Sequence, residues 1–154
     1  VYAPEGTNFV RTMLRLAGDR DVVRVVADQT GAPSAADDIA DAVIAVAANL
    51  VARPHDAALR GVFHLGVGPA TTWAGVARAV FAASRAQGGP SAEVEDITTA
   101  DYPTPARRPA FSLLDGARLK ERHGVAMPDW PRPLAACVGE IVKAANTGND
   151  GGGR

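Results

Sequence analysis

The chain has 154 residues, a length that fits one domain or a piece of a larger protein. Hydrophobic residues make up 47% of it, charged residues make up 21%, and the net charge is −1. This composition permits a buried core, and it argues against a disordered chain, a nucleic-acid-binding surface and a surface for anionic membranes.

The predicted elements alternate between helices and short strands along the chain. Helices are expected over residues 8–18, 34–53, 72–87, 115–123 and 131–145. Strands are expected over residues 21–27, 61–66 and 92–97, and the apolar segment 61–66 is the strongest of them. This alternation is typical of the α/β or the α+β class, and the Gly-rich residues 148–154 are expected to form a flexible tail.

Polar residues suited to cap helices stand at several predicted helix starts. Thr7 or Asn8 precedes the first helix, and Thr72 precedes the third. Ser34 precedes the second, with Asp37 three residues later in an arrangement that resembles a capping box. The sequence therefore predicts side-chain caps at three helix N-termini.

The expected compartment of the protein is the cytoplasm. No apolar run is long enough to cross a bilayer, and the first residues lack the basic and apolar regions of a signal peptide. The single cysteine, Cys137, excludes a disulfide within the chain and a cysteine metal cluster. Its helical spacing with Leu134 and Ile141 predicts a buried thiol rather than a reactive one.

The catalytic pair of a short-chain reductase is absent from the sequence. Such an enzyme needs a tyrosine with a lysine four residues later, where the lysine lowers the pKa of the phenol. Gly6 stands four residues after Tyr2, and Ala106 stands four residues after Tyr102. We also find no zinc-binding His-Glu-x-x-His, no Gly-x-Ser-x-Gly and no Walker-type motif, so no catalytic residue is predicted.

One glycine-containing loop imitates a dinucleotide-binding fingerprint. Gly66 and Gly68 lie between a predicted strand and a predicted helix, where backbone N–H groups can bind phosphate. Thr71 occupies the position of the third glycine, and Pro69 removes an N–H donor from the loop. An ordinary turn is therefore the preferred interpretation, and no cofactor-binding residue is predicted.

Arg107 and Arg108 are the strongest candidates for ligand binding. Prolines on both sides limit the freedom of their loop, so two guanidinium groups are presented at a modest cost in entropy. The planar fork of arginine matches phosphate oxygens in bidentate fashion. The alternative is that the two side chains are only solvated surface.

Each further candidate for ligand binding can also be explained by an ordinary structural role. Asn8 suits an anion at a helix N-terminus or simply caps the helix, and Gln29 either binds a sugar or base or is solvated. Asp37 lies among acidic residues that complement a helix dipole, with Mg²⁺ coordination as the alternative. His64 is expected in the core, whereas His123 is expected at the surface.

Segments spread over the chain combine into a more specific pattern. They are residues 8–16, 24–34, 38–40, 61–66, 71–73, 102–109, 112–115 and 128–130. The most specific of them reads Tyr-Pro-Thr-Pro-Ala-Arg-Arg-Pro. Together, in order and in register, they resemble the dTDP-4-dehydrorhamnose reductases, and the likeness extends from Val1 to about Ala145.

The resemblance implies the fold and the reaction. Members are extended short-chain dehydrogenases/reductases that reduce a dTDP-4-keto-6-deoxyhexose with NADPH or NADH to dTDP-L-rhamnose. The implied fold is α/β: residues 1–147 are the C-terminal portion, with the last Rossmann elements and a small α/β substrate-binding domain. The Gly-rich loop and the Tyr-x-x-x-Lys pair belong to an N-terminal half that this sequence lacks, so the chain by itself is expected to be inactive.

The resemblance also implies the roles of individual residues. Asn8 is placed near the substrate diphosphate, while Gln29, Arg107 and Arg108 are placed on the nucleotide side of the cleft. Some members dimerise around Mg²⁺ held by a glutamate, whose position matches Asp37, a residue that is one methylene shorter. A homodimer of the full-length protein is therefore implied, with a dTDP-sugar as ligand.

Two alternatives of the same fold remain open. One is a non-catalytic binding or regulatory subunit, and the other is a different sugar-nucleotide reductase or epimerase. Without most of the Rossmann strands, the apolar strand over residues 61–66 loses a neighbour on at least one edge. An uncovered apolar edge invites aggregation, so we expect the isolated chain to be poorly soluble or marginally stable.

Overall fold

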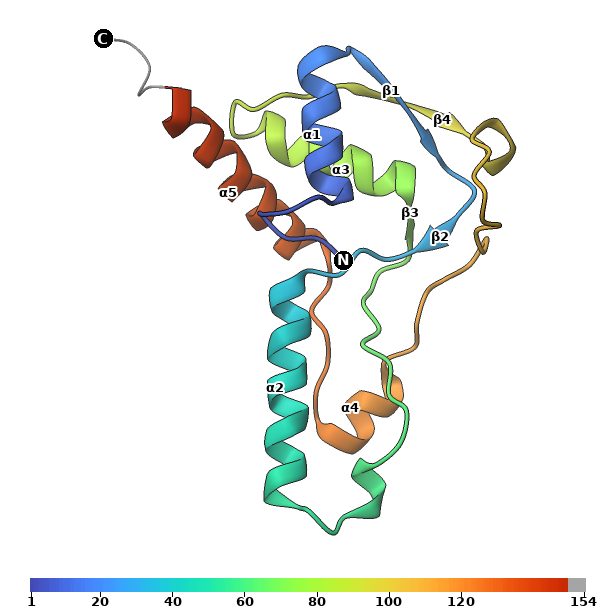
Figure 1. The fold of residues 1–154 in the computed structure, drawn as a ribbon, viewed down its shortest axis with the longest axis vertical. Coiled ribbons are helices and arrows are strands. Elements are labelled where there is room, and N and C mark those ends of the chain that lie inside the picture. The colour runs from blue at the N-terminus through green and yellow to red at the C-terminus, as the bar shows by residue number, and fades with distance from the viewer. Residues whose placement is uncertain (150–154) are drawn as a thin grey trace.

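The computed structural model describes residues 1–149 and consists of a helical body with an elongated extension (Figure 1). The body contains α1 (Phe9–Asp19), α3 (Trp73–Arg85) and α5 (Pro131–Asn149), which pack with β1 (Val22–Val26) and β4 (Glu93–Ile97). The extension contains α2 (Ala36–Ala52), the 3-10 turn η1 (Ala57–Leu59) and α4 (Ala117–His123). The short strands β2 (Thr30–Gly31) and β3 (Thr71–Thr72) lie between the two parts, and η2 (Thr99–Asp101) follows β4. Both views show α2 pointing away from the body, and the mixture of helices and parallel strands confirms the predicted α/β class.

A parallel pair of strands, β1 and β4, supports the body. The pair is in register from Val22 opposite Glu93 to Val26 opposite Ile97. Side chains alternate along β1, as a half-buried strand requires: Val23 and Val25 are buried, whereas Arg24 is exposed and pairs with Glu95 on β4 at 3.3 Å. The chain reaches β4 only after passing through α3, in agreement with the helical crossover that parallel strands need.

The hydrophobic core lies where α1, α3 and α5 meet each other and the sheet. Its largest fully buried apolar side chains within the body are Val10, Val80, Leu134 and Val138. Burial of each such side chain contributes about 1.5–3 kcal/mol. Cys137 belongs to this cluster, so the prediction of a buried thiol is confirmed.

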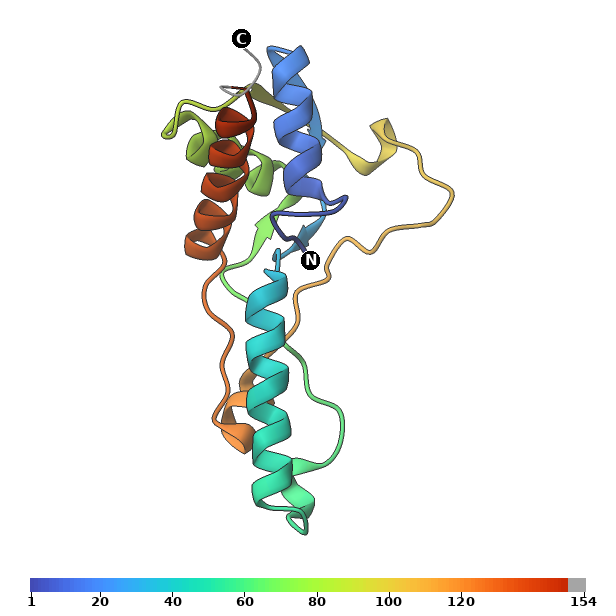
Figure 2. The ribbon, with the colours of Figure 1, turned by 60° about the vertical axis from the view of Figure 1, so that its left-hand side comes forward.

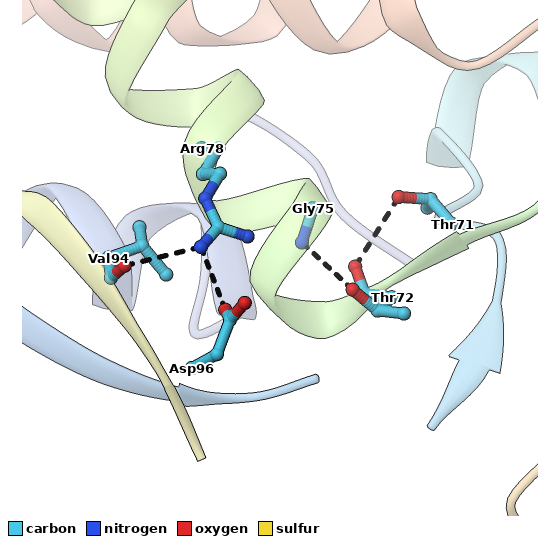
Figure 3. Close-up of polar contacts among 6 residues, drawn as sticks. All are labelled: Thr71, Thr72, Gly75, Arg78, Val94 and Asp96. Atoms are coloured by element: carbon cyan, nitrogen blue, oxygen red, sulfur yellow. Dashed lines mark hydrogen bonds and ion pairs between the residues drawn. The ribbon is translucent and has the colours of Figure 1, made fainter. Parts of the chain in front are cut away.

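The predicted cap at Thr72 is confirmed and lies at a junction of the fold. The Thr72 hydroxyl accepts a hydrogen bond from the Gly75 backbone N–H at 3.1 Å, which satisfies a free donor of the first turn (Figure 3). One turn later, the Arg78 guanidinium donates to the Asp96 carboxylate at 2.8 Å and to the Val94 carbonyl at 3.3 Å. These contacts fix the start of α3 against β4.

The predicted cap at Ser34 is wrong. Helix α2 begins at Ala36, its N-cap residue is Ala35, and no side chain caps it. The reason is a backbone pairing with the start of the chain: the Tyr2 carbonyl accepts from the Ala36 N–H, and the Tyr2 N–H donates to the Ser34 carbonyl, both at 2.9 Å. This pairing leaves Ala35 at the N-cap position, and its methyl side chain has no oxygen to accept from the second or third N–H of the helix.

The predicted strand over residues 61–66 is also wrong. The segment has no regular secondary structure, because no strand lies beside it within residues 1–149 to pair with its backbone. Its Phe63 ring instead meets the buried His123 ring edge-on at 4.7 Å, and the Arg118 guanidinium lies 4.8 Å from the same ring. The two histidine predictions are therefore reversed, since His64 is exposed and His123 is buried.

The C-terminal helix is longer than predicted. It continues past Ala145 to Asn149 and so includes the first two residues of the expected tail, while residues 150–154 lie outside the described part. Within residues 1–149, no helix combines the length and the apolar character that crossing a bilayer requires.

Candidate functional site

The two candidate arginines lie on a loop that leaves the body and returns to it (Figure 2). This arginine loop, residues 99–110, is exposed along nearly its whole length, and both Arg107 and Arg108 are exposed. Neither guanidinium has a hydrogen-bond or ion-pair partner among residues 1–149. The loop therefore presents two adjacent, uncompensated positive charges to solvent.

Gln29, the second candidate on the nucleotide side, lies at the base of the same loop. Its side-chain Nε2 donates to the Thr99 hydroxyl at 3.0 Å, so the amide nitrogen is used within the protein. The structure thus joins Gln29 to the loop that carries Arg107 and Arg108, although Gln29 and its partner Thr99 are 70 positions apart in sequence. Gln29 thus contacts the loop through its side-chain nitrogen.

Asn8 caps α1, as one of the predicted alternatives stated. Its side-chain oxygen accepts from the Arg11 N–H at 3.1 Å, and its Nδ2 donates to the carbonyls of Ala3 at 2.9 Å and Glu5 at 3.2 Å. The neighbouring Phe9 ring lies 4.9 Å from the Trp73 ring, which follows β3 directly. No hydrogen bond joins Asn8 to Gln29 or to the arginine pair within the described residues.

A cavity next to Asn8 does not include the arginine loop. It measures about 480 Å³, is open to solvent and lies between α1 and α5, with Arg11, Leu14 and Ile141 in its lining. Neither Gln29 nor any residue of the loop contributes to it. Residues 1–149 therefore join Gln29 to Thr99 at the start of the arginine loop, and they leave Asn8 at the edge of a separate depression.

Asp37, the predicted metal ligand, is exposed in the first turn of α2. It borders a small cavity of about 120 Å³ that also touches Tyr2, Asp38 and Glu140. Burial, helped by Asp41 and Asp37, raises the pKa of the Asp38 carboxyl. Within residues 1–149 no group of three or more His, Cys, Asp or Glu side chains is arranged to hold a metal ion. A cation at Asp37 would thus need ligands from elsewhere.

The Gly66–Thr71 loop is packed against the chain rather than open to a phosphate. The Trp130 side-chain N–H donates to the Pro69 carbonyl at 2.8 Å, and its backbone N–H donates to the Gly68 carbonyl at 3.0 Å. A Cβ atom on Gly66 would collide with the backbone of residues 114–116. These contacts favour the interpretation of this loop as a turn.

Sequence reasoning missed the residues that hold the arginine loop in place. Asp28 accepts hydrogen bonds from the Thr99 N–H and hydroxyl, and Thr30 pairs through its backbone with Ala110 and Ser112. One signal was present: Thr98 and Asp101 have capping-box spacing, and the structure shows the two reciprocal hydrogen bonds of that motif. That signal fixes a turn, but it does not reveal which distant residue the turn contacts.

Residues 1–143 match the family model described as the RmlD substrate binding domain. A dTDP-4-dehydrorhamnose reductase from Burkholderia thailandensis is 42% identical over 147 residues, which cover 92% of this chain and 49% of that protein. The chain spans about half the length of the curated relatives it matches.

Solved structures agree with the sequence comparison. A dTDP-4-dehydrorhamnose reductase ortholog from Clostridium acetobutylicum superimposes with a TM-score of 0.72 at 26% identity, and the match covers 92% of this chain and 45% of that one. A dTDP-4-dehydrorhamnose reductase from Bacillus anthracis, solved in complex with NADP, gives a TM-score of 0.67 at 27% identity over 87% of this chain and 43% of that one.

Proposed function

Because the chain belongs to the RmlD substrate binding domain family, we propose that it forms the sugar-nucleotide-binding part of a dTDP-4-dehydrorhamnose reductase. The ligand of this part is a dTDP-4-keto-6-deoxyhexose, and the product of the complete protein is dTDP-L-rhamnose. The names of the relatives support the substrate, and the sequence lacks the Tyr-x-x-x-Lys pair that proton transfer to the keto group requires. The chain alone is therefore inactive in this proposal.

The observation that carries the proposal is the pair of uncompensated guanidinium groups on the arginine loop. Arg107 and Arg108 are exposed, adjacent and unpaired among the described residues, while both ends of their loop are fixed. A diphosphate offers several oxygens in the geometry that guanidinium groups recognise. The two arginines would bind the nucleotide end and so orient the sugar toward the rest of the enzyme.

The remaining chemistry belongs to the part of the relatives that this chain does not cover. A nicotinamide cofactor supplies the hydride when it is bound, and the NADP complex of the Bacillus anthracis relative supports this cofactor class. In our proposal this chain contributes binding and orientation only. Three expectations stay predictions: Mg²⁺ at Asp37, a homodimer of the full-length protein and a cytoplasmic location.

The test is the affinity of the full-length protein for dTDP, measured by titration calorimetry. A hydrogen bond to a charged group is worth about 1.5–3 kcal/mol, and 1.4 kcal/mol is tenfold in affinity. We therefore expect Arg107→Ala combined with Arg108→Ala to weaken dTDP binding by about a hundredfold or more, and to leave NADPH binding unchanged.

The matched control is Arg132→Ala, which removes another exposed arginine, from the first turn of α5. Its dTDP affinity should equal that of the unmodified protein. An unchanged dTDP affinity in the Arg107/Arg108 double variant would contradict the proposed function.

A further inference from the structure

We infer that Asp28 and Gln29 are positioning residues, which hold the arginine loop in the conformation that presents Arg107 and Arg108 to the nucleotide. They belong to an anchor segment, residues 28–30, that contacts both ends of the loop. The inference rests on the proposed function, because it assigns to these residues an effect on dTDP-sugar binding that operates through the arginine pair.

The first step is the attachment at the start of the loop. Both carboxylate oxygens of Asp28 accept from the Thr99 backbone N–H, at 3.0 and 2.9 Å, and one of them also accepts from the Thr99 hydroxyl at 2.7 Å. The Gln29 amide also donates to that hydroxyl, at 3.0 Å. The hydrogen bonds from Thr99, with its backbone N–H as the largest contribution, lower the pKa of the Asp28 carboxyl.

The second step is the attachment at the end of the loop. The Thr30 backbone N–H donates to the Ala110 carbonyl, and the Thr30 carbonyl accepts from the Ser112 N–H, both at 2.8 Å. Because Thr30 follows Gln29 directly, three consecutive residues fix both ends of the loop. The anchor segment is itself held by the sheet, since the Ala27 N–H donates to the Ile97 carbonyl at 2.9 Å.

The third step is that little else holds the loop. Between the two attachments the chain contains three prolines, Pro103, Pro105 and Pro109, which have no backbone N–H to donate. Residues 101–110 are all exposed. If the Asp28 contacts are lost, the loop gains conformational freedom, and ordering it again on binding costs affinity.

The chemistry of Asp28 argues against direct contact with the substrate. Its oxygens are already used by Thr99, and a carboxylate beside a diphosphate would repel it. The side chain is exposed and forms no part of the hydrophobic core, so its removal is expected to free the loop without unfolding the protein. Asp28 thus acts through the arginines.

The test is a double-mutant cycle in the full-length protein, read by titration calorimetry with dTDP. Asp28→Ala should weaken dTDP binding about threefold to tenfold, because a few additional side chains must then be ordered on binding. The same substitution should have no further effect on dTDP affinity when Arg107→Ala and Arg108→Ala are already present. The KM for the dTDP-sugar should rise while kcat and NADPH affinity stay unchanged. Asp28→Asn, which keeps one acceptor oxygen for Thr99, should restore part of the loss.

The matched control is Asp96→Ala. Asp96 is also an exposed, hydrogen-bonded carboxylate at the same sheet, but its partner is Arg78 rather than the loop, so dTDP affinity should not change. An unchanged affinity in Asp28→Ala, or a loss that is fully additive with the loss from the arginine substitutions, would overturn the inference. If the Arg107/Arg108 variant binds dTDP normally, the proposed function itself fails, which distinguishes the two outcomes.

Discussion

At the scale of single residues, the buried thiol of Cys137 makes a direct prediction. Burial, with smaller contributions from Glu140, Glu5 and Asp37, raises the pKa of the thiol to about 11. Because only the thiolate is a nucleophile, about one thiol in a thousand is reactive at pH 8 in the folded state, against roughly a quarter for an ordinary cysteine. We expect the folded chain to react far more slowly with a disulfide reagent than the chain in guanidinium chloride.

The raised pKa of Cys137 also fixes the direction in which the stability of the fold changes with pH. The pKa of the Cys137 thiol in the folded chain lies above the ordinary value of about 8.5. Its contribution to the free energy of unfolding is therefore fully present below about pH 8.5 and is lost as the pH rises through about 11. Labelling kinetics at pH 8, with and without denaturant, check the predicted difference in reactivity between the folded and the unfolded chain. Equal rates in the two conditions would show that Cys137 is exposed.

Single residues also show where sequence reasoning about the site ended. Residue type and loop context make Arg107, Arg108 and Gln29 candidates, and the family resemblance assigns them a place in the cleft. The structure joins Gln29 to the arginine loop. Asp28 was missed, because its partner Thr99 is 71 positions away and no local pattern connects the two. Such contacts depend on how β1 and β4 lie side by side, which the sequence around either residue does not encode.

At the scale of elements, the two predicted caps with opposite outcomes provide a matched pair of variants. The Thr72 hydroxyl accepts from the Gly75 N–H, so Thr72→Ala should lower the free energy of unfolding by about 1 kcal/mol. Ser34 makes no capping hydrogen bond, because the N-cap position of α2 is Ala35, so Ser34→Ala should change the free energy of unfolding by less than about 0.5 kcal/mol. Urea unfolding of the two variants checks the order, and a larger loss from Ser34→Ala would refute this assignment of the caps.

The helices were predictable and the strand at 61–66 was not, for a physical reason. Helical hydrogen bonds join residues four positions apart, so periodicity and caps within one segment contain most of the signal for α1, α3 and α5. A strand exists only when another strand pairs with it. The apolar pattern of segment 61–66 predicted a strand, but within residues 1–149 the segment packs on His123 and α4 instead of a sheet.

At the scale of the whole molecule, helix α2 lacks an apolar environment. Only one of its residues, Ala42, is buried, while Val43, Ile44 and Val51 are mostly exposed, the last at 83%. Both views show α2 standing away from the body, with the short α4 and connecting coil segments beside it (Figures 1 and 2). An exposed apolar helix face of this kind marks a surface that another structure covers. Since the chain spans half the length of its relatives, we propose that the part they have in addition covers it.

This proposal predicts opposite effects of one variant in two contexts. Ile44→Lys with Val51→Lys places two charges on the exposed face of α2. In the isolated chain we expect the pair to raise the monomer fraction, because less apolar surface remains for self-association. In the full-length protein we expect the same pair to lower the melting temperature, since it buries two charges without partners.

The control adds the same charge elsewhere: Ala135→Lys with Ala144→Lys lies on exposed positions of α5. Light scattering after size exclusion measures the monomer fraction, and calorimetry measures the melting temperature. With the control pair, the melting temperature of the full-length protein should stay near that of the unmodified protein. If the α2 pair leaves it equally unchanged, the face of α2 is open to solvent in the complete protein. The apolar residues of α2 would then need a partner other than the remainder of the chain.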